Sequence, residues 1–420
     1  MRSTTSIRTL FAVFVTALLA GTSVLLAAPP AEAATDIPPA QAVTDTADES
    51  CPNRTLPPPP VDSSEEPPPG EESPSPLPVP ETPAGGERMA ECGIVRPANS
   101  PAPPEDITAA AWLVQDLDTG EVLAAKNPHG RYRPASLIKT LLALVVLEKL
   151  PPDHVVVATE EDANQECTCV GLVEGGEYTV DQLVHTLLMH SGNDVAHALA
   201  TALGGMDAAV EKMNALAEWL GAADTRAATP SGLDGPGMMT SAYDMSLVFR
   251  YAMQQPAYAE AVGTKHINFP GGPGEPDFPV YNDNRLWASY EGFLGGKTGF
   301  TDDARHTYAG AAERDGKRVA VVLLRAEQQP IRVSEQAERL LDYGFTLAAE
   351  GSEPVGTVTT APPISSVDDG EESTDVTDVA ATSPSDPFGT TGWIVTLIVT
   401  VIVITGLLVA HRKGLLRRPD

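Results

Sequence analysis

A serine and a lysine stand three residues apart in the segment RPASLIKTLLALVVLEKL, residues 133–150. Ser136 and Lys139 fall on one face of the helix predicted there, because residues i and i+3 are neighbours on a helix. Apolar residues at helical spacing carry the same helix into a core, where burying a charged ammonium group is costly. A serine hydroxyl is a weak nucleophile until a base removes its proton, and burial favours the neutral form of a lysine. The pair therefore predicts covalent catalysis through Ser136, with Lys139 as the base.

Two further short motifs add weight to this prediction. Ser191-Gly192-Asn193 stands between two predicted helices, in LLMHSGNDVAHALA, and Lys297-Thr298-Gly299 stands in a predicted strand flanked by glycines, in GFLGGKTGFTDD. A serine and lysine at this spacing are common by chance in a chain of this length, whereas Lys-Thr-Gly is much rarer. All three motifs in this order, each on a suitable element, form a specific signal.

Together these motifs resemble those of the penicillin-recognising serine enzymes. Flanking stretches such as WLVQDLDTGEVLAAKNPHGRYRPASLIKT and YEGFLGGKTGFTDDA are similar to the D-alanyl-D-alanine carboxypeptidases, which are low-molecular-weight penicillin-binding proteins. The resemblance runs through nearly all of residues 105–347. It implies removal of the terminal D-alanine from peptidoglycan stem peptides through an acyl-enzyme, and acylation by β-lactams. It also implies that no metal or organic cofactor is needed.

The resemblance assigns four catalytic residues. Ser136 is the expected nucleophile and Lys139 the base that activates it. Ser191 would relay a proton to the leaving D-alanine, and Asn193 would orient Lys139 and the substrate amide.

Five further residues are implied to bind substrate. Lys297 and Thr298 would hold the terminal carboxylate, and Gly299 would let the substrate backbone lie against the strand. The backbone N–H of Phe300, with that of Ser136, would form an oxyanion hole. Arg332 is a looser match to an arginine that helps bind the carboxylate in some relatives.

Three other functions remain open at this stage. A DD-endopeptidase would use the same residues, and a non-hydrolytic β-lactam sensor would keep Ser136 and Lys139. A class A-like β-lactamase needs a glutamate that positions the deacylating water. Glu160, Glu161 and Glu166 precede the Ser191 motif, without the glutamate-x-x-leucine-asparagine spacing of those enzymes.

The order of predicted elements is strands, then helices, then strands again. A hairpin is expected over residues 111–126, and three strands over 292–299, 307–312 and 318–326. Between them, helical periodicity predicts helices after Ser136 and over residues 178–189, 193–203, 208–220 and 241–253, and a closing helix follows at 333–343. This order predicts an α+β fold. In family terms it is β-lactamase/transpeptidase-like, an antiparallel sheet flanked by helices with a mostly helical insert.

Segments outside residues 105–347 predict an exported, membrane-anchored chain. Residues 1–33 have the pattern of a secretory signal peptide, and the apolar residues 392–410 are long enough to cross a bilayer. The basic residues 411–420 then predict a cytoplasmic tail, with the catalytic domain outside the cell membrane. Residues 34–104, rich in proline and acidic residues, predict an extracellular spacer, and residues 348–391 a disordered acidic tether.

Charge and cysteine content complete the prediction. The net charge of -30 argues against nucleic acid as a partner. Four cysteines outside the cytosol permit disulfides, with Cys51–Cys92 favoured and Cys167–Cys169 as the second pair.

Overall fold

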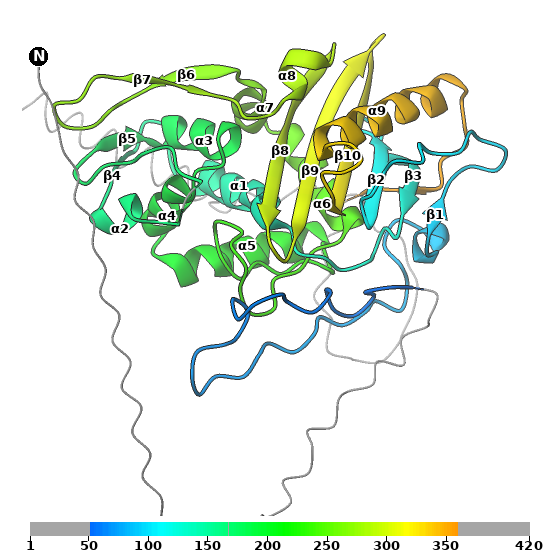
Figure 1. The fold of residues 1–420 in the computed structure, drawn as a ribbon, viewed down its shortest axis with the longest axis horizontal. Helices are drawn as coiled ribbons and strands as arrows, with labels where there is room; N and C mark the ends of the chain where they lie inside the picture. The colour runs from blue at the N-terminus through cyan, green and yellow to red at the C-terminus, as the bar shows by residue number, and fades with distance from the viewer. Residues whose placement is uncertain (1–50, 167, 360–420) are drawn as a thin grey trace, which may run out of the picture. The chain divides into compact units, whose positions relative to one another are not determined.

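The fold is described by a computed structural model for residues 51–166 and 168–359. Its centre is an antiparallel sheet in the order β1-β3-β2-β10-β9-β8, with β11 paired to β3 (Figure 1). These strands are β1 (Ile94–Val95), β2 (Ala111–Asp116), β3 (Glu121–Lys126), β8 (Phe293–Thr301), β9 (Arg305–Arg314), β10 (Lys317–Ala326) and β11 (Gly356–Thr357). The edge position of β8 leaves one of its sides free of strand partners among the described residues.

Two small sheets and most of the helices lie between β3 and β8 in the chain, whereas η1 precedes β1 and α9 follows β10. The small sheets pair β4 (Val155–Val157) with β5 (Glu177–Thr179) and β6 (His266–Phe269) with β7 (Phe278–Tyr281). The helices are η1 (Glu87–Ala90), η2 (Ala135–Ile138), α1 (Lys139–Lys149), α2 (Glu160–Ala163), α3 (Val180–Met189), α4 (Asn193–Ala202), α5 (Met206–Leu220), α6 (Ala242–Met253), α7 (Pro256–Gly263), α8 (Leu286–Ser289) and α9 (Val333–Ala349). The observed order of elements confirms the predicted α+β fold.

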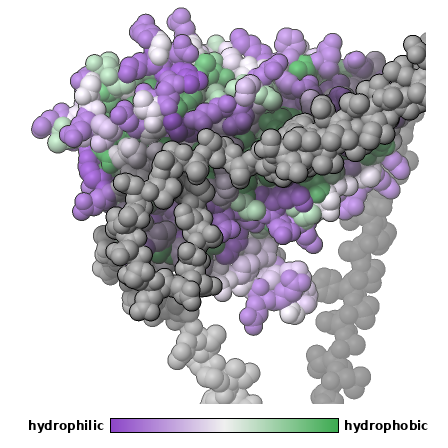
Figure 2. All heavy atoms as spheres, turned by 180° about the vertical axis from the view of Figure 1, so that it is seen from behind, coloured by the Kyte–Doolittle hydropathy of each residue, from purple (hydrophilic) through white to green (hydrophobic). Residues whose placement is uncertain are grey.

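The central sheet separates two hydrophobic cores. Helix α9 packs on one face of the sheet, and its core includes Trp112, Tyr308 and Leu340. Helix α6 packs on the other face, next to the helical region around α1. On the side seen in Figure 2 the visible side chains are mostly hydrophilic, with hydrophobic ones interspersed. Apolar burial on both faces of the sheet therefore provides the main stabilisation.

Local sequence signals account for several element ends. Thr179 caps α3 through a capping box with Gln182, as its sequence predicts. Ser241 accepts a hydrogen bond from the backbone N–H of Asp244 at the start of α6. The β9–β10 turn places Asp315 and Gly316 at positive φ, the conformation that an Asp-Gly hairpin turn requires.

The segment predicted as a spacer differs from that prediction over residues 51–104. Residues 51–96, called here the N-terminal arm, run along the domain and return into the sheet, where β1 pairs with β3. Met89 and Val95 are buried in the larger core, and the predicted Cys51–Cys92 disulfide closes the arm on itself. The composition of the arm indicated a solvated chain, but its backbone carbonyls are bound by arginines of the domain, described below.

The predicted tether also differs in its first residues. Val355 and Val358 are buried, and β11 adds to the sheet beside β3. The folded domain therefore continues to residue 359, beyond the predicted boundary at 347. Residues 360–391, the signal peptide, the predicted membrane span, the basic tail and Cys167 lie outside the described residues. Within the described residues, no helix is both long and apolar enough to span a membrane.

Candidate active site

The predicted nucleophile and base meet at the start of the first long helix. Ser136 lies in η2 and Lys139 begins α1, so the helix predicted to start at Ser136 opens with a 3-10 turn. The Lys139 ammonium donates to Ser136 Oγ at 3.0 Å, to Asn193 Oδ1 at 2.7 Å and to the Ser231 carbonyl at 2.5 Å. Three acceptors thus fix the Nζ atom beside the hydroxyl that it would deprotonate.

A second lysine and serine face this pair from other elements. Lys297 Nζ, on the edge strand β8, donates to Ser191 Oγ at 2.7 Å and to the Thr298 carbonyl at 2.7 Å. Ser191 stands between α3 and α4 with φ 67, a left-handed conformation that is uncommon for serine. Backbone strain of this kind gathers at functional sites. The fold thereby joins residues from three distant motifs in one place.

Asn193 ties the site to the loop that precedes α3. Its Oδ1 atom accepts from Lys139, its Nδ2 donates to the Glu166 carbonyl at 2.6 Å, and its backbone N–H donates to the Thr168 carbonyl at 2.7 Å. The next residue, Asp194, accepts from the backbone N–H groups of residues 170–172. Glu166 lines the cleft, and the contact it makes with Asn193 is through its carbonyl oxygen.

Burial lowers the pKa of both lysines, and a like charge lowers that of Lys139 further. Lys139 is fully buried, and its burial, together with the nearby charge of Lys297, holds its pKa well below the ordinary value. Burial lowers the pKa of Lys297 to about 8, against the opposing charge of Asp283. A lysine with a lowered pKa is neutral in part near neutral pH and can accept a proton. The environment of Lys139 therefore suits a general base.

Two glycines let other backbone segments lie close to the backbone of the nucleophile. A Cβ on Gly299 would lie 2.9 Å from the backbone nitrogen of Ser136, and so would a Cβ on Gly232. The predicted reason for Gly299 was contact with substrate, whereas the structure adds a packing reason within the protein. Thr307 Oγ1 donates to the Pro134 carbonyl at 2.9 Å and fixes the same turn.

A cleft of about 590 Å³ opens over these residues. Its lining includes every predicted site residue except the two buried lysines, namely Ser136, Ser191, Asn193, Thr298, Gly299, Phe300 and Arg332. Arg332, at the start of α9, is exposed there. Thr298 Oγ1 donates to Asp283 at 3.3 Å. The structure therefore brings all nine predicted site residues to one cleft and its floor.

Several residues of the cleft were not predicted. The Ser231 carbonyl and Gly232 come from the loop between α5 and α6, where no site residue was predicted. Arg285 lines the same cleft and belongs to no predicted motif. Asp62 and Ser64 come from the N-terminal arm. A backbone carbonyl has no residue type to reveal it, and the arm carried a composition signal that pointed elsewhere.

Comparison with known proteins agrees with this geometry. The profile of the peptidase S11 family, D-alanyl-D-alanine carboxypeptidase, matches residues 97–328. D-alanyl-D-alanine carboxypeptidase DacB2 of Mycobacterium tuberculosis is 44% identical over 262 residues, which cover 61% of this chain and 89% of that protein. D-alanyl-D-alanine carboxypeptidase DacD of Escherichia coli is 33% identical, over 58% of this chain and 65% of that one.

Solved structures give the same result. The crystal structure of a D-alanyl-D-alanine carboxypeptidase from M. tuberculosis matches with a TM-score of 0.59 and 41% identity, covering 64% of this chain and 100% of that chain. The Streptomyces K15 DD-transpeptidase matches with a TM-score of 0.55 and 27% identity, covering 59% of this chain and 100% of that one.

Proposed function

Because this chain belongs to the D-alanyl-D-alanine carboxypeptidase family of serine hydrolases, we propose that it removes the terminal D-alanine of peptidoglycan stem peptides through an acyl-enzyme on Ser136. One observation carries the assignment of the nucleophile. Ser136 Oγ is hydrogen-bonded at 3.0 Å to a fully buried lysine whose pKa is held well below its ordinary value.

The proposed reaction has two steps. Lys139 takes the proton of Ser136 Oγ as this oxygen attacks the carbonyl carbon between the two D-alanines. The new C–O bond gives a tetrahedral oxyanion, which the backbone N–H groups of Ser136 and Phe300 would stabilise. The C–N bond then breaks, and the proton passes through Ser191 to the amine of the leaving D-alanine. Water attacks the acyl-enzyme in the second step and restores the Ser136 hydroxyl.

The cations at one side of the cleft support the binding of a carboxylate. Lys297 reaches Ser191, so a carboxylate bound by Lys297 and Thr298 would lie close to the proton relay. Arg285 and Arg332 line the same cleft, and an arginine can hold a carboxylate through two parallel hydrogen bonds. A β-lactam carries a carboxylate and a reactive acyl group in a similar arrangement, so acylation of Ser136 by penicillin belongs to the same proposal.

A matched pair of proteins tests this function. The full-length chain and its Ser136→Ala variant are given an acyl-Lys-D-Ala-D-Ala peptide, and released D-alanine is measured. Release that disappears in the variant supports the proposal. No release from a protein that still takes up labelled penicillin at Ser136 contradicts hydrolysis and favours a β-lactam sensor or a strict DD-endopeptidase. Rapid turnover of penicillin itself favours a β-lactamase.

We further propose that the domain acts outside the cell membrane, with residues 1–33 as signal peptide and residues 392–410 as a single membrane span. The support is the run of 19 residues without a charge, followed by Arg412, Lys413, Arg417 and Arg418. Cell fractionation with a carbonate wash tests the anchor. Recovery of the chain in the soluble fraction would contradict it.

A further inference from the structure

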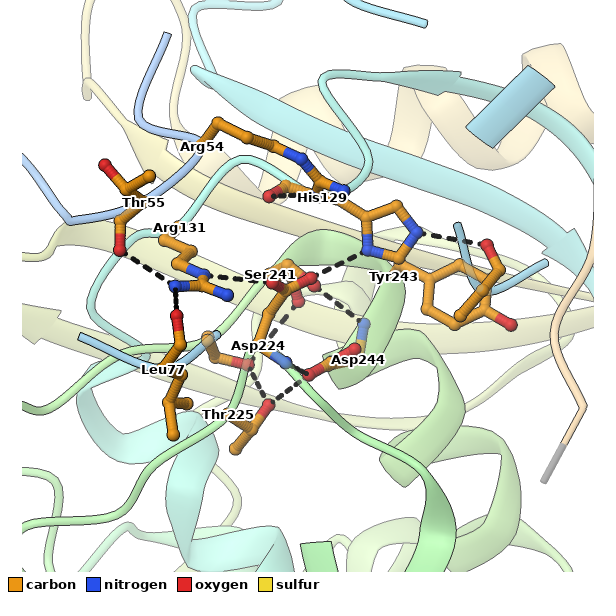
Figure 3. Close-up of polar contacts among 12 residues, drawn as sticks. Arg54, Thr55, Leu77, His129, Arg131, Asp224, Thr225, Ser241, Tyr243 and Asp244 are labelled. Carbon is orange, nitrogen blue, oxygen red and sulfur yellow. Dashed lines mark hydrogen bonds and ion pairs between the residues drawn. The ribbon is translucent and has the colours of Figure 1, made fainter. Parts of the chain in front are cut away.

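The N-terminal arm is held firmly on the domain near the nucleophile. The Arg131 guanidinium donates to the carbonyls of Thr55, Leu77 and Pro78, at 2.9, 2.6 and 2.9 Å. Figure 3 shows Arg131 between Asp224 on the domain side and the carbonyls of Thr55 and Leu77 on the arm side. The Cys51–Cys92 disulfide and the β1–β3 pairing hold the two ends of the arm.

The middle of the arm reaches the rim of the cleft. The backbone N–H of Val61 donates to Asp303 Oδ1 at 2.5 Å, and Ser64 Oγ donates to Asp303 Oδ2 at 3.4 Å. Glu65 forms a bidentate ion pair with the buried Arg133, in which Nη2 of Arg133 donates to Oε2 of Glu65 at 2.6 Å. These contacts set Asp62 and Ser64 into the lining of the cleft.

The direction of strand β8 shows which part of a bound peptide would lie next to the N-terminal arm. Lys297 and Thr298 lie at one side of Ser136, and Phe300, Thr301 and Asp302 follow on the other side of Gly299. The C-terminal end of β8 points toward the arm in Figure 1. If the terminal carboxylate lies at Lys297 and Thr298, as the proposed function requires, the residue that precedes the two D-alanines extends toward Asp302 and the arm.

We propose that the N-terminal arm is a wall of the substrate site that selects stem peptides whose residue before D-Ala-D-Ala carries a free side-chain amine. In peptidoglycan this residue is a diamino acid, and its amine is either free or joined to a second peptide. The inference rests on the proposed function, because that function fixes the direction of the peptide along β8.

The charge and the size of the substrate side chain both favour a free amine at this wall. Asp62 and Asp302 are exposed carboxylates in the cleft lining, and Asp234 lines the same cleft. The Arg305 guanidinium lies 4.0 Å from Asp302 and offsets part of its charge, so Asp62 is the carboxylate that the arm itself adds. They attract an ammonium group, whereas an amine joined to another peptide is a neutral amide. The joined amine also carries a second chain into the space that the arm occupies. A free amine is therefore favoured on both grounds.

The test compares two peptides on three full-length proteins. One peptide is acyl-Lys-D-Ala-D-Ala with a free lysine amine, and the other carries a tripeptide joined to that amine. The proteins are the wild type, an arm-released Val61→Pro/Glu65→Ala variant and a Val61→Ala control. Proline removes the N–H that binds Asp303, whereas alanine keeps it, and the Glu65 change removes the partner of Arg133.

We expect the wild type and the Val61→Ala control to prefer the free peptide by about tenfold in kcat/KM, and the arm-released variant to lose most of this preference. An equal preference in all three proteins, or none in the wild type, would overturn the inference. Uptake of labelled penicillin at Ser136 in each protein verifies that the site is intact.

A second readout separates this inference from the proposed function. Acylation of Ser136 is timed with two penicillins, one with a free amine on its side chain and one with that amine joined to the same tripeptide. A wild-type preference for the free amine that the arm-released variant loses supports the wall even where no D-alanine is released. Identical acylation rates for both penicillins in the wild type contradict it.

Discussion

Two of the buried groups of ionisable side chains in the described domain are arranged in opposite ways. At the candidate active site, Lys139 and Lys297 are both buried lysines, and the charge of Lys297 disfavours the charged form of Lys139. At the anchor of the N-terminal arm, Arg131 and His129 are paired with Asp224 at 2.9 and 2.7 Å, with Asp244 behind them (Figure 3).

The hydrogen bonds of the anchor pair cationic and basic groups with a carboxylate. His129 places Nδ1 2.7 Å from Asp224 and Nε2 3.1 Å from the Ala84 carbonyl, so each ring nitrogen has a partner. Burial alone would raise the pKa of Asp224, but the hydrogen bond and charge of His129 and the charge of Arg131 lower it. Opposite charges stabilise a docked segment, whereas like charges keep a lysine reactive.

Removing Lys139 should cause the largest loss of activity. A Lys139→Met variant keeps most of the side-chain volume and cannot accept a proton, so acylation of Ser136 by penicillin should fall by about 10²–10⁴-fold. Its stability should also fall, because Asn193 Oδ1 and the Ser231 carbonyl lose their buried donor, so acylation is compared on folded protein. Lys149→Met, at the exposed end of α1, is the matched control. An unchanged acylation rate in Lys139→Met would show that Lys139 is not the base.

Breaking the anchor should affect stability and leave the chemistry in place. An Arg131→Leu variant removes the ion pair with the buried Asp224 and leaves three arm carbonyls without their donor, at an expected cost of about 3–5 kcal/mol in the free energy of unfolding. Chemical denaturation measures the loss, and limited proteolysis detects release of the arm. The control Arg54→Gln removes a single half-exposed hydrogen bond to the His129 carbonyl and should cost about 1 kcal/mol or less. Equal effects in both variants would contradict the anchor.

Lys297 tests how far a neighbouring positive charge lowers the pKa of Lys139. Lys139 acts in its neutral form, so the acylation rate falls as the pH drops below its pKa. A Lys297→Met variant removes the neighbouring positive charge and thereby raises the pKa of Lys139. The fall should then begin at higher pH than in the wild type. The pH at which the acylation rate falls to half its maximum is measured with a chromogenic penicillin. This midpoint is independent of any change in the maximal rate. An unchanged midpoint would mean that burial alone lowers the pKa of Lys139.

Asp244, at the anchor of the N-terminal arm, should give the smallest effect, which is a change in how stability depends on pH. Burial and the charge of Asp224 raise its pKa from 3.8 to about 7. Between these values the folded state binds a proton that the unfolded state has released, so stability falls as the pH rises. Asp244→Asn does not titrate, and the slope should lessen by up to about 1.4 kcal/mol per pH unit. Urea denaturation between pH 4.5 and 7 measures it, and parallel slopes in both proteins would contradict the assignment.

The sequence predicted the location of the candidate site better than its surroundings. Ser136, Lys139, Ser191, Asn193 and Lys297 belong to short motifs defined by residue type and spacing, and the fold brings them together. The Ser231 carbonyl that accepts from Lys139 has no such signal, because every residue has a backbone carbonyl.

Composition also misled the prediction for the N-terminal arm. A proline-rich acidic segment was expected to be a solvated spacer, because it has few apolar side chains to bury. Its docking depends on carbonyl groups that bind Arg131 and on a single carboxylate, Glu65, that binds Arg133. The information lies in these two arginines, outside the segment whose structure they determine.

The two glycines beside Ser136 limit which substitutions could make this protein resistant to β-lactams. Any side chain at Gly232 or Gly299 would press against the backbone of the nucleophile, so substitutions closest to the inhibitor would also damage the enzyme. Asp62 and Ser64 are exposed residues of the arm that line the same cleft. We expect selection under an inhibitor to accumulate changes along the arm and to leave the two glycines untouched.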